Sequence, residues 1–464
     1  MTTLQTRPSE ALATDTRRRW VTGSVLLALF LAAMDATVMG TLLPVLKAEF
    51  EQPQLYPWLM SGFLFSSVVS IPLIGLLADR VGEKRMMLAS IAAFIGSSYL
   101  VASAGSMLGL ITSRVLQGVG AGGIVVLAYV MVGKLYSNDE RGKMQGVLSA
   151  IWGLAAVSGP MLGTLFHTYF SWRWAFLMNL PLGAVFFVLM ATLYPEAESK
   201  PHPTRFDGIG FVSFVVGSLA LLMLIMAGAL NLTMPALVIL VLVMLLSFAV
   251  LGVSMRRRLL HSFLAYEFFS SRLSVAGLAT VLGSLVVYAA MTLLPMYLVD
   301  ITGRRVLDAG FVVLMASLGW TGGATFCGFK INQWGARTCC FIGFLLLGSG
   351  ALVLSFTTAL SALGWYLLAQ FCIGLGIGFV ATASLMLAQN SAGHARMGVM
   401  TSAIQLFRNL GAALGVNSLA ALQFWLVSGL VLPLQTSYTL CFYSLLGIAM
   451  LGALLTRLLP RQQR

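Results

Sequence analysis

GLLADRVGEKR, residues 75–85, separates two apolar runs, and a diverged repeat of it, GFKINQWGAR, occupies residues 328–337. The glycines of the two stretches match at a single offset of 253 residues: Gly75, Gly82, Gly328 and Gly335. Two further pairs of segments match in the same order, RVLQGVG (114–120) with QFCIGLG (370–376) and SGPMLG (158–163) with LGAALG (410–415). Matches in one order at nearly constant offsets predict a chain of two homologous halves, as in many membrane transporters.

The composition predicts a polytopic membrane protein. Of the 464 residues, 59% are hydrophobic and 9% are charged, and the mean hydropathy is +0.92. A soluble protein cannot enclose that much apolar surface. The net charge of +13 would suggest a nucleic-acid partner in a soluble domain, but here the basic residues lie in short loops between apolar runs. Orientation in a bilayer is the simpler cause, so we expect no nucleic-acid partner.

Fourteen apolar runs are long enough to cross a bilayer, which requires about 20 residues. They are residues 21–43, 57–78, 86–104, 107–133, 143–166, 174–194, 207–230, 234–255, 273–298, 309–329, 338–357, 362–388, 397–424 and 436–459. With the N-terminus inside the cell, the predicted cytoplasmic segments hold 22 of the 28 Lys and Arg residues, and the outer loops hold 4. This distribution predicts that both termini are cytoplasmic.

The loops between these runs are too short to form soluble domains. The predicted parts are a cytoplasmic tail (1–20), an N-terminal six-helix bundle (21–195), a central two-helix insertion with its flanking loops (196–272), a C-terminal six-helix bundle (273–459) and a second cytoplasmic tail (460–464). The predicted fold class is therefore an all-α polytopic membrane protein.

These segments resemble the major facilitator superfamily, and within it the fourteen-helix drug:proton antiporters. Residues 75–85 resemble the superfamily's loop signature, and LITSRVLQGVGAG (110–122) resembles its fourth-helix motif. GLAAVSGPMLG (153–163) is similar to the antiporter motif, although Thr164 replaces the last glycine. MDATVMGTLLP (34–44) resembles the first-helix motif of the fourteen-helix branch. The resemblance implies the major facilitator fold, two six-helix bundles plus two additional central helices, and transport by alternating access.

Asp35 is a carboxylate in the middle of the first apolar run, roughly 12 Å below its outer boundary. A carboxylate at depth costs about 2.5–3.5 kcal/mol on insertion scales, so it should face a cavity or a partner. Removal from water favours the neutral form and would allow reversible protonation. No other Asp or Glu lies deep in a predicted span, so Asp35 is the candidate proton carrier. The alternative is a static ion pair that only holds helices together.

Two arginines lie inside predicted spans. Arg114 enters the fourth span at a depth similar to that of Asp35, and the resemblance implies that its motif takes part in proton transfer. We predict that Asp35 and Arg114 face one central cavity; alternatively, the Arg114 side chain extends to the outer surface. Arg408 lies near the middle of the thirteenth span, where a role in the substrate cavity and a structural role are both open. One deep acid against two deep arginines does not favour a carrier of divalent cations.

Two motifs are candidates for conformational gating. The loop candidates are Gly75, Asp79, Arg80, Gly82 and Arg85. The resemblance implies that Asp79 stabilises the outward-open state, and the start of the thirteenth helix near Met397 is its candidate contact. In the fifth span small residues permit close helix packing and a proline bends the helix; the candidates are Gly159, Pro160 and Gly163. Ordinary packing would also account for this second group.

The predicted function is proton-coupled multidrug efflux, the export of amphipathic small molecules. The alternative is a dedicated exporter of an endogenous metabolite, such as a siderophore or a peptide-like product. The four histidines are scattered and no catalytic or nucleotide-binding motif is visible, so we predict a secondary active transporter rather than an enzyme. We expect no metal and no cofactor, with the proton gradient as energy source. The expected partners are a small-molecule substrate, protons and the lipid bilayer of the plasma membrane; the sequence does not indicate a membrane-fusion or outer-membrane partner.

Overall fold

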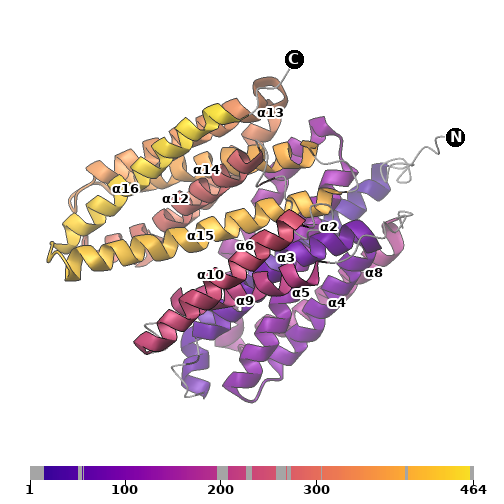
Figure 1. The fold of residues 1–464 in the computed structure, drawn as a ribbon. Coiled ribbons are helices and arrows are strands. Elements are labelled where there is room, and N and C mark those ends of the chain that lie inside the picture. The colour runs from indigo at the N-terminus through magenta and orange to yellow at the C-terminus, as the bar shows by residue number, and fades with distance from the viewer. Residues whose placement is uncertain are drawn as a thin grey trace. The chain divides into compact units, whose positions relative to one another are not determined.

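The computed structural model describes residues 15–50, 55, 57–195, 207–225, 232–257, 268, 273–304, 306–391 and 396–459. The regular elements in these ranges are all helices (Figure 1). The chain divides into two compact units, and each unit includes a short segment from the other half of the sequence. Unit 1 holds residues 1–136, 154–266 and 392–402, and unit 2 holds residues 137–153, 267–391 and 403–464.

Unit 1 is built mainly from the first half of the chain. Its helices are α2 (Asp15–Phe50), α3 (Pro57–Val81), α4 (Glu83–Ala102), α5 (Met107–Leu135), α7 (Trp174–Leu177), α8 (Asn179–Leu193), α9 (Gly208–Ile225) and α10 (Met234–Arg257), with the later part of α6 (Asn138–Tyr169) and the start of α15 (Met397–Ser428). α5 packs against α2, α3 and α4, and α8 packs against α2 and α4 (Figure 1). Glycines make this close packing possible: a Cβ on Gly118 would overlap Phe63, and one on Gly120 would overlap Phe94.

Unit 2 repeats this arrangement with the second half of the chain. Its helices are α12 (Leu273–Asp300), α13 (Val306–Phe356), α14 (Leu363–Ser391), α16 (Leu434–Leu455) and the rest of α6 and α15. α14 packs on α12 and α13, and α16 packs on both of these helices as well (Figure 1). The core between them is apolar and aromatic, with the Tyr297 ring 5.4 Å from that of Tyr438 and 5.7 Å from that of Phe442.

The two copies of the repeated loop break the helices at equivalent glycines. Gly82 (φ 103°) separates α3 from α4, and Gly335 (φ 78°) lies at a kink inside α13. Both backbones occupy the left-handed half of φ space, which residues with a Cβ rarely adopt. The match between the two halves that the sequence predicts is therefore also present in the backbone. The kink at Gly335 lies between the predicted spans 309–329 and 338–357, so α13 consists of two helical segments that meet at this glycine.

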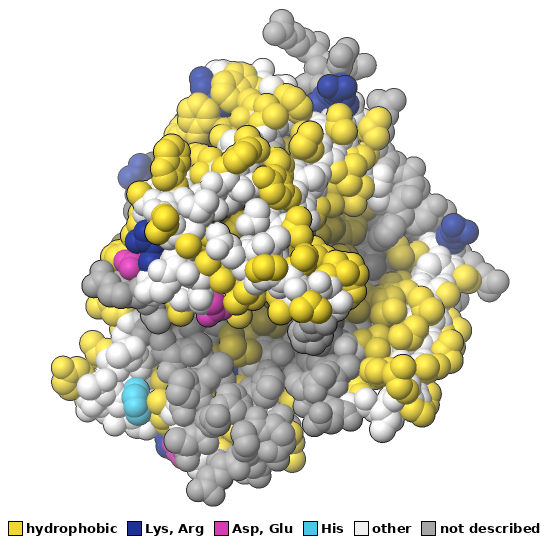
Figure 2. All heavy atoms as spheres, turned by 90° about the vertical axis from the view of Figure 1, so that its left-hand side faces the viewer, with side chains coloured by type: hydrophobic (Ala, Val, Ile, Leu, Met, Phe, Trp, Pro, Cys, Tyr) yellow, Lys and Arg dark blue, Asp and Glu magenta, His cyan; other side chains and the backbone are white. Residues whose placement is uncertain are grey.

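Ten helices among the described residues are long and apolar enough to cross a membrane. Described helices lie in all fourteen predicted spans, with 174–194 divided between α7 and α8 and with 207–230 described only as far as residue 225, and the count of fourteen itself stays a prediction. α10 shows the apolar exterior most clearly, because several of its side chains are more than half exposed: Met234, Val238, Leu242, Leu245 and Leu246. On the face drawn in Figure 2, hydrophobic side chains predominate among the described residues and charged ones are few. These surfaces fit an integral, multi-pass membrane protein.

The first helix is longer than the predicted span 21–43, because α2 begins at Asp15 and ends at Phe50. Polar contacts hold its N-terminal turns. Arg17 Nε donates a hydrogen bond to the carbonyl of Leu193, and the Arg18 guanidinium lies 4.9 Å from the centroid of the Tyr136 ring. The helix therefore continues beyond the apolar run, and residue 20, where the predicted tail ends, is not a helix boundary. Residues 1–14 and 460–464 of the two predicted tails lie outside the described residues.

Candidate functional site

The Asp35 carboxylate lies on α2 inside unit 1 and is fully enclosed. Its exposed fraction is 0%, and that of Arg114 on α5 is 1%. Arg114 Nη1 donates to Asp35 Oδ2 at 2.5 Å, so the two residues form a buried ion pair. The structure thus brings together the carboxylate and the guanidinium that the sequence places at equal depth. It excludes the alternative in which the Arg114 side chain extends to the surface, and in this state neither side chain lines an open cavity.

Two amides complete the coordination of the carboxylate. Asp35 Oδ1 accepts hydrogen bonds from Gln117 Nε2 at 3.0 Å and from Asn179 Nδ2 at 3.2 Å. Gln117 lies one turn after Arg114 on the same face of α5, and its side-chain oxygen accepts from Arg114 Nη1 at 2.6 Å. The Gln117 amide therefore bridges the anion and the cation.

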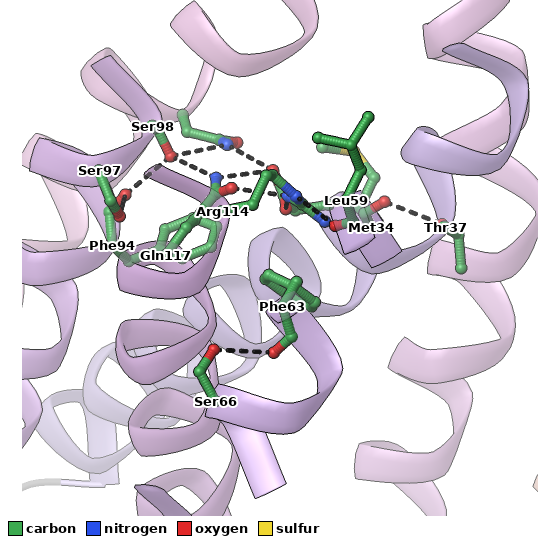
Figure 3. A network of polar contacts seen from close by, with 12 residues as sticks. Met34, Thr37, Leu59, Phe63, Ser66, Phe94, Ser97, Ser98, Arg114 and Gln117 are labelled. Carbon is green, nitrogen blue, oxygen red and sulfur yellow. Dashed lines mark hydrogen bonds and ion pairs between the residues drawn. The ribbon is translucent and has the colours of Figure 1, made fainter. Parts of the chain in front are cut away.

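Ser98 on α4 ties the two amides to a third helix. Its hydroxyl accepts from Gln117 Nε2 at 2.8 Å and from Asn179 Nδ2 at 3.2 Å, and it donates to the backbone carbonyl of Phe94 at 2.7 Å. Figure 3 shows Ser98, Gln117 and Arg114 connected in this network. Helix α2 contributes Asp35, α5 contributes Arg114 and Gln117, and α4 and α8 contribute one residue each, so three neighbouring helices hold the acid.

Aromatic rings face the cation of this pair. The Arg114 guanidinium carbon lies 4.1 Å from the centroid of the Phe63 ring on α3 and 5.8 Å from that of Phe176 on α7. Arg114 Nε also donates to the backbone carbonyl of Leu59 at 3.5 Å. A cation over an aromatic face is stabilised by about 2 kcal/mol or more where water is excluded.

The energetics of a buried ion pair are asymmetric. Enclosing both charges costs desolvation energy, which the contact between the charges roughly offsets. Removal of one charge leaves the other buried and unpaired, at a cost of about 3–5 kcal/mol. Loss of the Asp35 charge would therefore leave the Arg114 guanidinium buried without its anion.

The predicted antiporter motif on α6 packs directly on the helical turn that carries Asp35. A Cβ on Gly159 would overlap the Thr37 hydroxyl and touch the Met34 carbonyl. Thr37 Oγ1 in turn donates to the backbone carbonyl of Ala155 at 3.0 Å. α6 and α2 are thus in close contact beside the ion pair. Gly163 is buried in the same helix, and the side chain of Pro160 lies outside the described residues.

Asp79, in the repeated loop, caps the start of α15. Its two carboxylate oxygens accept hydrogen bonds from the backbone N–H groups of Gly398 and Val399, each at 3.0 Å. This is the contact near Met397 that the sequence predicts, and it joins residues from opposite halves of the chain within unit 1. A Cβ on Gly75 would overlap the Gly398 carbonyl, so the two backbones touch there. An acid at a helix N-terminus is favourable by about 0.3–1 kcal/mol, and by up to about 2 when partly buried.

Unit 2 contains the corresponding backbone contact without the acid. Gly328, the repeat partner of Gly75, packs on Gly142 of α6 so closely that a Cβ on either residue would overlap the other backbone. The second-half loop has Asn332 and Gln333 around the position that Asp79 occupies in the first. The glycine contact is therefore duplicated, while the charged cap belongs to the first half.

The remaining predicted residues lie apart from the ion pair. Arg408 is half-buried on α15 in unit 2, so its place in a substrate cavity stays a prediction. Arg80 is half-buried, and its Nε and Nη2 have no hydrogen-bond partner within the described part of the chain. Arg85 is exposed at the start of α4.

Sequence analysis missed the residues that complete the site. Gln117 stands within the RVLQG segment beside Arg114, and Asn179 stands within the segment 172–183, but neither is charged. Ser98 and Phe63 carry no signal beyond their residue type. Spacing of three residues places Gln117 on the face of Arg114, and this was the one available indication.

The chain is similar to transporters along most of its length. Residues 25–416 match the Major Facilitator Superfamily. The Multidrug transporter protein MdtP of Bacillus subtilis is 27% identical over 416 residues, which cover 88% of this chain and 75% of that protein. Multidrug resistance protein 3 of the same bacterium is 25% identical, with 87% and 79% covered. The efflux pump FUS6 of Gibberella fujikuroi is 27% identical, with 90% and 79% covered.

Two solved structures share the fold. The human organic anion transporter MFSD10 (TETRAN) has a TM-score of 0.68 and 19% identity, and the match covers 95% of this chain and 99% of that one. The proton:xylose symporter XylE has a TM-score of 0.67 and 14% identity, with 95% of each chain covered. At these identities the similarity concerns the fold alone.

Proposed function

The chain belongs to the Major Facilitator Superfamily, and from that premise we propose that it is a proton-coupled multidrug efflux transporter that exports amphipathic small molecules by alternating access. The observation that carries the proposal is the enclosed carboxylate of Asp35 in an ion pair with Arg114. The names of the relatives, two multidrug proteins and an efflux pump, support export rather than import.

In this proposal a proton and the substrate use the site in turn. Protonation of Asp35 breaks the charge balance of the pair, so the helices that share the network repack, and release of the proton restores the pair. The Asp79 contact with α15 is present in only one of the alternating states, and its capping energy biases the equilibrium between them. The proton gradient is the energy source, and no metal or cofactor takes part.

The proposed setting is the plasma membrane, with both termini in the cytoplasm and the lipid bilayer as the surrounding solvent. The proposed substrate carries at most one positive charge, because the deep acid is already matched by Arg114. A membrane-fusion or outer-membrane partner is not part of the proposal.

The test is transport in inverted vesicles with an imposed pH gradient and a panel of amphipathic dyes and antiseptics. We expect accumulation that consumes the gradient and that Asp35→Asn abolishes, while exchange of substrate without a gradient persists. The matched control is Asp308→Asn at the start of α13, which should retain gradient-driven transport. Full gradient-driven transport by Asp35→Asn would show that Asp35 has no role in proton coupling.

The same panel distinguishes the alternative function. A multidrug exporter accepts several unrelated compounds that compete with one another. A dedicated exporter of an endogenous metabolite, such as a siderophore or a peptide-like product, accepts one chemical class and does not transport the dyes.

A further inference from the structure

The Arg114 guanidinium has supports that do not depend on the Asp35 carboxylate. The ring of Phe63 lies 4.1 Å and that of Phe176 lies 5.8 Å from the guanidinium carbon. The side-chain oxygen of Gln117 accepts from Nη1 at 2.6 Å, and the carbonyl of Leu59 accepts from Nε at 3.5 Å. Together these groups offer two aromatic faces and two oxygens to one buried cation.

Residues close together in the chain supply several of these contacts to Arg114. Phe63 follows Leu59 by one turn of α3, so one face of that helix supplies both a ring and a carbonyl. Phe176 precedes Asn179 by three residues, so one short segment supplies a ring to the cation and an amide to the anion.

The cation cannot be neutralised by losing its own proton. Arginine stays charged at physiological pH, so when Asp35 is neutral Arg114 becomes a buried cation without its anion. Among the described residues no second charged side chain forms an ion pair or hydrogen bond with either member. The elements packed around the pair turn toward it groups that do not titrate: Leu59, Phe63, Ser98, Phe176 and Asn179. Thr37 on α2 and the adjoining part of α6 add no charge either.

We propose that Phe63 and Phe176, together with the side-chain oxygen of Gln117, form a cage that holds the charged Arg114 guanidinium while Asp35 is neutral. The cage makes the neutral state of Asp35 accessible, and in the proposed transport cycle it favours proton uptake at this site. The two phenylalanines are positioning residues, because they act on Asp35 through Arg114. The role in transport rests on the proposed function, whereas the cage itself is a property of the folded protein.

Thermal stability tests the cage without transport. Asp35→Asn mimics the neutral acid, and Phe63→Leu removes the ring while keeping most of its volume. Melting temperatures are measured for the wild type, the two single variants and the double variant. We expect Phe63→Leu to lower the melting temperature by at least about 2 °C more in the Asp35→Asn background than in the wild type. Equal losses in the two backgrounds would overturn the cage.

Two further variants control this cycle. Phe186→Leu removes a buried ring on α8 that is not among the described rings over the Arg114 guanidinium, Phe63 and Phe176, so its loss should be the same in both backgrounds. Phe63→Tyr keeps the ring and should restore the melting temperature of Asp35→Asn. If Asp35→Asn with Phe63→Leu fails to fold while Asp35→Asn with Phe63→Tyr folds, the requirement for a ring is supported. Failure of both double variants would count against the cage, because a retained ring should have been sufficient.

The pH profile of transport tests the consequence. Without a ring the neutral state of Asp35 is less favourable, so more acid is needed to reach it. For Phe63→Leu and for Phe176→Leu we expect the pH of half-maximal gradient-driven transport to move about one pH unit to the acid side. Phe186→Leu should leave the midpoint in place. If the melting temperatures support the cage but the transport midpoint does not move, the cage has no role in proton coupling. If the protein transports no compound, the proposed function is wrong, and the melting temperatures still test the cage.

Discussion

At the scale of the residue, this protein depends on one carboxylate and the groups that balance it. Asp35 is bound by Arg114 and Gln117 from α5 and by Asn179 from the start of α8. All four side chains are fully enclosed, with exposed fractions of 0% or 1%. Because water cannot screen charges there, any change of charge at one residue is felt at once by its partner.

Arg114→Leu should destabilise the protein. At neutral pH the Asp35 charge is left buried and unpaired, at a cost of about 3–5 kcal/mol. The measurement is the melting temperature of both proteins at neutral pH.

The matched control is Arg173→Leu, which breaks the Arg173–Glu49 pair at 2.9 Å. Both side chains of that pair are more than one-third exposed, so the loss should be only about 0–1 kcal/mol. If Arg114→Leu lowered the melting temperature no more than Arg173→Leu, an unpaired charge at Asp35 would not carry the cost of burial.

At the scale of the element, helix starts and helix breaks carry the candidate gating contacts. Asp79 at the end of α3 caps α15, and the glycines at 75 and 398 let the two backbones meet. Gly142 and Gly328 form the corresponding contact between α6 and α13. In each half, then, a glycine of the repeated loop packs against the start of a helix from the other half of the sequence.

Asp79→Asn should loosen the first turn of α15. Asparagine keeps one acceptor for Gly398 or Val399 but loses the charge, which is worth about 0.3–1 kcal/mol at a helix N-terminus. Amide hydrogen exchange of the peptide that spans residues 396–402 should accelerate roughly twofold to fivefold. Glu49→Gln, a change of charge at an exposed ion pair, should leave that peptide unaffected. Unchanged exchange in Asp79→Asn would show that the cap does not stabilise this helix start.

Gly335→Ala and Gly82→Ala should each destabilise the fold. Their φ values of 78° and 103°, with ψ values of 154° and 141°, lie in a region that is nearly restricted to glycine, and a Cβ there costs about 1–3 kcal/mol. Gly447→Ala in α16 is the control, because open space surrounds that position and alanine favours helix, so it should be neutral or stabilising. Thermal denaturation of the three variants checks this. Equal stability of Gly335→Ala and Gly447→Ala would contradict the strain assigned to the kink.

At the scale of the whole molecule, the protein is an integral membrane protein whose chain consists of two related halves. The apolar exterior, the ten candidate spans and the family match agree on an integral membrane transporter. The two halves differ in their buried charged residues. At the position of Arg114, the second half has Gln370, which is fully buried and whose amide has no partner among the residues that the structure describes. The buried ion pair is therefore a feature of the first half.

Labelling of single cysteines should reveal the orientation of the molecule. In a chain whose five native cysteines are replaced by alanine, Gly105→Cys lies in a predicted outer loop and Val81→Cys in a predicted cytoplasmic one, and both positions are exposed. An impermeant maleimide applied to intact cells should label Gly105→Cys and reach Val81→Cys only after permeabilisation. The opposite pattern would reverse the orientation derived from the basic residues.

The sequence by itself was sufficient for the features that depend on neighbours along the chain. Apolar runs determine helices, paired glycines mark the breaks at residues 82 and 335, and a lone acid in an apolar run marks Asp35 as costly and in need of a partner. The pairing of Asp35 with Arg114 could be anticipated from equal depth, since charges that are removed from water seek each other.

Only the tertiary structure decided which neutral groups surround that pair. Asn179 is 144 residues from Asp35 in the chain, and Gln117 is 82 residues away. Serine, amide and phenylalanine side chains are common in membrane helices, so their residue types do not indicate that they converge on one point. Packing of α2, α3, α4, α5, α7 and α8 brings them together, and it encloses the pair where an open cavity was expected. Charge can be located from sequence because burying it is expensive, whereas the neutral shell follows from the geometry of packing.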